Sequence, residues 1–117
     1  MTYEEKISWL SRYREAEKLY QRLSYRLAEA QEATRHITQN LSAAPGGSKD
    51  GQSLARAVER EEEAERRAYA QLAVCDALFA EIDAVLVQLD SAEYCALRKY
   101  YLDCLKWEQV AEIGRAH

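Results

Sequence analysis

The chain has 117 residues and a formal net charge of −4, with 31% charged and 48% hydrophobic residues. Four glycines and one proline are few, and this composition is typical of long amphipathic helices. No apolar run approaches the length of a membrane span, and the acidic residues 1–6 do not read as a secretory signal. The negative charge argues against a protein that binds nucleic acid over its whole surface.

The first predicted element is a helix that begins at Thr2 and continues to about Leu41. Thr2 and Glu5 have the spacing of a capping box, which satisfies free amides at a helix start. Apolar or small residues then recur at alternating steps of three and four. They are Trp9, Tyr13, Ala16, Tyr20, Leu23, Leu27, Ala30, Thr34, Ile37 and Leu41. This rhythm is that of a coiled coil.

Residues 42–52 contain Pro45 and three glycines, which predicts a loop. A second helix with the same rhythm follows, and a short loop makes the two helices antiparallel. Its positions are Leu54, Val58, Glu61, Glu65, Ala68, Leu72, Cys75, Phe79, Ile82, Leu86 and Leu89. Pairing Leu41 with Leu54 places large residues opposite small ones, as Phe79 opposite Ala16. We call these two facing rows the seam.

Two features of this hairpin call for an explanation. Glu61 and Glu65 fall on the seam, where a buried unpaired carboxylate is costly, so we expect both to reach water in part. Apolar residues also lie beside the seam and need a cover, which the C-terminal helices or a second copy of the chain would provide. They are Leu10, Leu19, Leu78, Val85 and Val87.

Residues 91–117 form a second region after the hairpin of residues 1–90. Asp90 and Glu93 make another capping box, followed by an amphipathic helix, a break near residues 103–106 and a second short helix. This order is that of the first part of a helix-turn-helix. Its scaffold would be Leu97, Tyr101, Trp107, Val110 and Ala111, and only three residues follow Gly114. The fold class expected is therefore all-α, with an incomplete helix-turn-helix that lacks its recognition helix.

Residues 97–111, LRKYYLDCLKWEQVA, resemble the start of the region 4 helix-turn-helix of sigma factors. The layout also resembles a family of sigma-like transcriptional regulators from phages and prophages. Those proteins have a segment similar to EKISWLSRYR at residues 5–14 and a loop similar to APGG at residues 44–47. The chain departs from the family at Cys104, where Gly is favoured, and at Lys106, where Ser or Thr would cap the helix.

The resemblance implies a transcriptional regulator in the cytoplasm, that of the bacterial host if a phage encodes it. The partners that it implies are DNA, provided the recognition helix is present, and RNA polymerase or a second copy of the chain. Lys106 and Arg115 are the candidate phosphate contacts. The alternative is a helical protein–protein interaction or assembly module that does not bind DNA.

An enzyme is not expected, because the chain has two histidines and no nucleophile–base arrangement. No catalytic residue, metal ligand set, cofactor or small-molecule substrate is predicted. Gly46 to Lys49 superficially resembles a phosphate loop but lacks its spacing and the preceding strand. The thiols of Cys75, Cys95 and Cys104 have no paired-ligand spacing and are expected to be reduced and buried.

Overall fold

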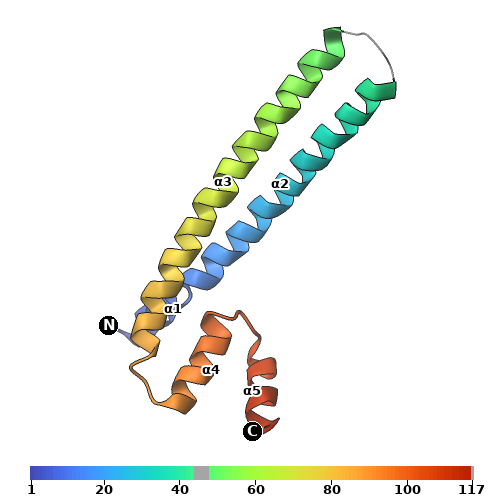
Figure 1. Cartoon of the computed structure of the whole chain (residues 1–117). Helices are drawn as coiled ribbons and strands as arrows, with labels where there is room; N and C mark the ends of the chain where they lie inside the picture. Colours follow the sequence, from blue (N-terminus) through green and yellow to red (C-terminus); the bar gives the residue numbers. More distant parts are fainter. Residues whose placement is uncertain (44–47, 117) are drawn as a thin grey trace. The chain divides into compact units, whose positions relative to one another are not determined.

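The computed structural model describes residues 1–43 and 48–116, and side chains within residues 1–41 and 51–115. The described residues form five helices and no strand, which confirms the all-α prediction (Figure 1). They are α1 (Tyr3–Leu10), α2 (Arg12–Ala43), α3 (Ser48–Leu86), α4 (Ser91–Tyr101) and α5 (Trp107–Ala116). The long helices α2 and α3 run side by side in opposite directions, as the hairpin prediction requires. No helix among the described residues is long and apolar enough to cross a membrane.

Three boundaries differ from the prediction. The first helix is broken at Ser11, where the hydroxyl donates to the Ile7 carbonyl at 2.7 Å and the backbone amide donates to the same carbonyl. The predicted loop 42–52 is too long, because residues 42–43 and 48–52 are helical and residues 44–47 lie outside the described part. Extending an existing helix adds a hydrogen bond for each residue fixed, which offsets the weak helix propensity of Gly51. The second helix ends at Leu86, three residues early, since the chain turns before Asp90.

Both predicted N-caps are present. The Thr2 hydroxyl accepts the amide of Glu5 at 3.1 Å, and the Asp90 carboxylate accepts the amide of Glu93 at 2.9 Å. Every seam position is buried or half-buried except Leu89, which the early end of α3 leaves exposed. Glu61 and Glu65 are half-buried, which agrees with the expected partial access to water.

The chain divides into two compact units. Unit 1 comprises Met1–Lys18 and Ala73–His117, and unit 2 comprises Leu19–Leu72. This division differs from the boundary predicted at residue 90, because Leu97 and Leu102 pack with Ile82 and Leu86 inside unit 1.

The core of unit 1 consists of Ile82, Leu86 and Leu102, which are at most 3% exposed. Trp9, Leu10, Tyr13, Phe79, Tyr94 and Leu97 pack around these three residues. The C-terminal helices were expected to cover the apolar residues beside the seam, and Leu10 does pack in this cluster. Val85 and Val87 remain exposed at 47% and 55%.

Unit 2 has a thinner interior. Among its described residues only Ala57 and Ala68 are buried, each 4% exposed, and the larger seam residues are half-buried. Its surface carries ion pairs one helical turn apart, such as Glu63 with Arg66 and Arg67. These pairs are exposed to solvent, which screens them, so they contribute little to stability.

Candidate functional site

The candidate site is the segment α4–turn–α5, which lies within unit 1. Two of its predicted scaffold residues hold α4 in place. Tyr101 is 3% exposed, and Leu97 packs against the core cluster. The next residue, Leu102, belongs to the core itself, so the end of α4 is fixed before the turn begins.

The turn between α4 and α5 is closed by backbone hydrogen bonds. The amides of Leu102 and Asp103 both donate to the Arg98 carbonyl, at 2.8 and 2.9 Å, and the Leu105 amide donates to the Lys99 carbonyl at 3.0 Å. Cys104 has a φ of 59°, the left-handed conformation that commonly ends a helix and that glycine adopts most easily. Burial raises the pKa of its thiol, so the group stays neutral near pH 7.

Arg14 of α2 joins this turn to the N-terminal segment of the chain. Its guanidinium donates to the Tyr100 carbonyl at 2.5 Å and to the Leu105 carbonyl at 3.3 Å. The same group lies over the Tyr100 ring, 4.2 Å from the ring centroid. A cation at carbonyls left over at a helix end stabilises that end, so Arg14 closes the C-terminus of α4.

Trp107, the first residue of α5, is fixed by aromatic contacts with α4. Its ring stacks on Tyr100 at 3.9 Å with an angle of 7° between the planes, and it meets Tyr101 edge-on at 6.2 Å. Trp107 is still 47% exposed, so its outer face is open to solvent. These contacts hold the start of α5 against α4.

The rest of α5 is held less firmly. Val110 is half-buried and lines a shallow groove of about 410 Å³ between α4 and α5, together with Ala92, Cys95, Ala96 and Ile113. Ala111, also predicted as scaffold, is exposed and contributes no buried surface in this structure. Lys106 has the N-cap position but no capping oxygen, and its amide donates instead to the Gln109 side chain at 2.9 Å.

The two candidate phosphate contacts, Lys106 and Arg115, are both exposed. Neither makes an ion pair with another described residue, so both charges are available to a ligand. They lie at opposite ends of α5 with Glu108 and Glu112 between them on the same helix. The local charge is therefore balanced, and any phosphate contact would rest on individual side chains.

Two features of the site did not follow from the sequence alone. Arg14 was not singled out, because its partners Tyr100 and Leu105 are 86 and 91 residues away. The left-handed backbone at Cys104 had one signal, since the family resemblance favours glycine at that position. Cys95 was expected to be buried and is exposed, whereas Cys75 is buried and Cys104 half-buried, and all three thiols are free.

No group of three or more histidine, cysteine, aspartate or glutamate side chains is arranged to hold a metal within the described part of the chain. No protein family model, no curated protein and no solved structure matches this chain.

Proposed function

We propose that this protein is a sigma-like transcriptional regulator in which α4, the turn and α5 form the scaffold of a DNA-binding helix-turn-helix. The observation that carries the proposal is the left-handed Cys104 in the turn. It occupies the position where the sigma-like pattern has glycine, a residue suited to that backbone. The turn lies between the short helices α4 and α5, as the scaffold of a helix-turn-helix requires.

The contact of Arg14 adds support from a second part of the sequence. Arg14 ends the N-terminal segment that resembles the same family, and it binds the carbonyls of Tyr100 and Leu105 at the turn. Two segments that carry the resemblance thus meet in unit 1. In the proposed regulator, Leu97, Tyr101, Trp107 and Val110 orient the helices, whereas Lys106 and Arg115 touch phosphates.

The test is DNA binding measured by fluorescence anisotropy on a mixed pool of promoter duplexes at low and moderate salt. The 117-residue chain is compared with a version extended by a recognition helix of the sigma type. We expect the extended chain to bind and the change of Lys106→Gln with Arg115→Gln to lower the salt slope by about two. Arg22→Gln with Arg35→Gln removes the same charge from exposed positions of unit 2 and serves as the control. Failure of both chains to bind would contradict the proposal.

A second candidate function is a helical protein–protein interaction module. It is favoured by an apolar groove of about 580 Å³ in unit 1, which Trp9, Leu10, Val85, Leu86, Leu89 and Leu97 line in part. Val85 and Leu89 are themselves exposed at 47% and 37%, and exposed apolar patches commonly mark interaction sites. If DNA binding fails in both chains, this module becomes the leading candidate, and polymerase and a second copy of the chain are the partners to test.

A further inference from the structure

A groove runs along unit 2 between α2 and α3. It contains two hollows of about 360 and 230 Å³, and both hollows are lined by Arg56 and Arg60. On α3 the groove extends from Ser53 to Arg67, which is roughly 21 Å at 1.5 Å per residue. We call this feature the arginine groove.

The floor of the arginine groove is made of small and apolar side chains. Ala57 is 4% exposed, and Ala30 and Ala64 are half-buried, as are Leu23 and Ile37 from α2. These small alanine side chains leave holes that the two helices of unit 2 do not fill. Large apolar side chains of a third helix would fit such holes.

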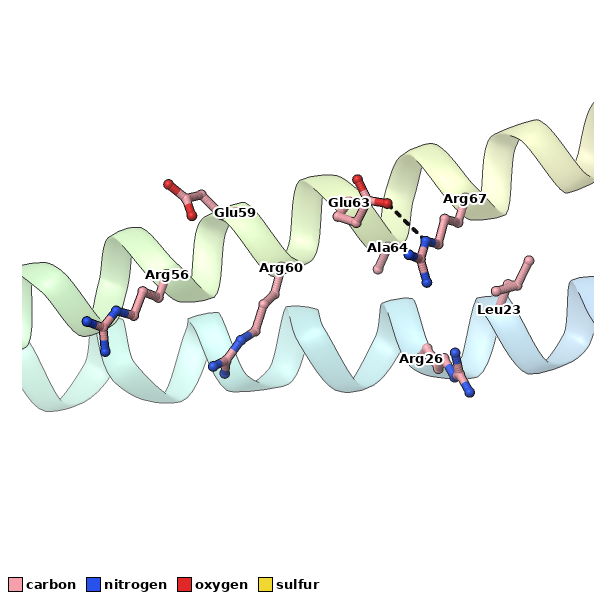
Figure 2. Close-up of a pocket in the computed structure, with 8 residues that line it drawn as sticks. All are labelled: Leu23, Arg26, Arg56, Glu59, Arg60, Glu63, Ala64 and Arg67. Carbon is pink, nitrogen blue, oxygen red and sulfur yellow. Dashed lines mark hydrogen bonds and ion pairs between the residues drawn. The ribbon is translucent and has the colours of Figure 1, made fainter.

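The walls of the groove are basic on both sides. Arg26 comes from α2, and Arg56, Arg60 and Arg67 come from α3 (Figure 2). Glu59 and Glu63 also line the larger hollow, so its four arginines outnumber its carboxylates by two. In Figure 2 the Arg60 side chain reaches toward α2, whereas the Glu59 side chain points away from α2. Glu63 is bound to Arg66 and Arg67, and Arg26, Arg56 and Arg60 make no ion pair with any residue that the structure describes.

We infer that the arginine groove binds an acidic amphipathic helix of a partner protein. Three unpaired guanidinium groups beside an apolar floor complement a helix with large apolar residues on one face and carboxylates along both edges. A nucleic acid backbone would match the arginines but leave the apolar floor unused. The groove lies wholly within Leu19–Leu72, so the inference does not depend on DNA binding through α4 and α5.

The test uses a fluorescein-labelled synthetic helix of roughly 18 residues, long enough to span the groove. It carries leucines at helical spacing on one face and glutamates on both flanks. A second peptide has the same composition in a scrambled order, and a third has lysine in place of glutamate. We expect the full chain to bind the first peptide at least about tenfold more tightly than either of the others.

Variants of the chain locate the binding surface. Arg56→Gln with Arg60→Gln is expected to weaken binding of the first peptide about tenfold or more. Arg22→Gln with Arg35→Gln makes the same charge change at exposed positions outside the groove and should leave binding nearly unchanged. Ala33→Leu keeps all charges but fills the groove at an exposed position, so it should also weaken binding. Circular dichroism confirms that each variant keeps its helices.

Three results would overturn the inference. The first is equal binding of the ordered and scrambled acidic peptides, which would mean that the floor is not used. The second is an equal effect of the two arginine pairs, which would place binding elsewhere. The third is tighter binding of a single-stranded oligonucleotide that depends on Arg56 and Arg60, which would make nucleic acid the ligand of this groove.

Discussion

The two units share the long helices α2 and α3 but differ in how they are stabilised. In unit 1, Ile82, Leu86, Tyr101 and Leu102 are at most 3% exposed, and aromatic rings surround them. In unit 2 the only buried residues among those described are two alanines. The same heptad rhythm therefore yields a packed core where further helices cover it and a thin contact where two helices stand alone.

The largest expected effect comes from changing leucine to alanine in each unit and comparing the losses in the free energy of unfolding. Leu86→Ala removes a side chain that is 2% exposed and should lower the free energy of unfolding by about 3 kcal/mol. Leu23→Ala removes the same atoms from a half-buried position in unit 2 and should cost about 1 kcal/mol. Urea denaturation followed by circular dichroism measures both. Equal losses would show that unit 2 is packed as tightly as unit 1.

A substitution at Arg14 tests whether polar contacts also contribute to the stability of unit 1. Arg14→Met keeps the apolar stem but removes the bonds to Tyr100 and Leu105, and it should cost about 2 kcal/mol. The stacked Trp107 should become more mobile, which its fluorescence anisotropy would report after Trp9 is changed to Phe. Lys18→Met is the control, because Lys18 makes only an exposed pair with Glu15. A loss no greater than that of the control would mean that the turn does not need Arg14.

A substitution at Glu61 should stabilise unit 2 and so reduce the difference in packing between the two units. This half-buried carboxylate lies on the seam, and Glu61→Ile should raise the free energy of unfolding by about 1 kcal/mol through added apolar contact. Glu62→Ile places the same side chain at an exposed neighbouring position and should have little effect. The midpoint of thermal unfolding distinguishes the two. A lower midpoint for Glu61→Ile would argue against the register of the hairpin.

The features predicted correctly from the sequence are those set by residues close together along the chain. The N-caps at Thr2 and Asp90 depend on a residue three positions later, and the seam depends on steps of three and four. The break at Ser11 could not be predicted from its hydroxyl, because Thr34 and Thr38 also donate to the carbonyl four residues earlier and α2 continues there unbroken. The contact of Arg14 with the α4–α5 turn joins residues far apart in sequence, and no local pattern encodes it.

Cys104 bears on the geometry of the turn within unit 1. A non-glycine residue at a φ of 59° is strained by about 1 kcal/mol, so Cys104→Gly should be about 1 kcal/mol more stable than Cys104→Ala. Both variants lose the half-buried thiol, and their difference therefore isolates the backbone conformation. Chemical denaturation of the pair provides the measurement. If the alanine variant is as stable as the glycine variant, the left-handed conformation is not retained in solution.

Substitutions at Lys106 should have the smallest effect on stability, and this effect should be confined to α5. The Gln109 side chain already accepts the Lys106 amide, which is one half of a capping box. Lys106→Ser supplies the missing oxygen for the amide of residue 109 and should stabilise α5 by somewhat less than about 1 kcal/mol. Lys106→Ala removes the same charge without adding an acceptor. Hydrogen exchange of the first α5 amides should slow in the serine variant and not in the alanine variant. Equal exchange in both would mean that α5 is held by the stacking of Trp107 on Tyr100, and not by its first turn.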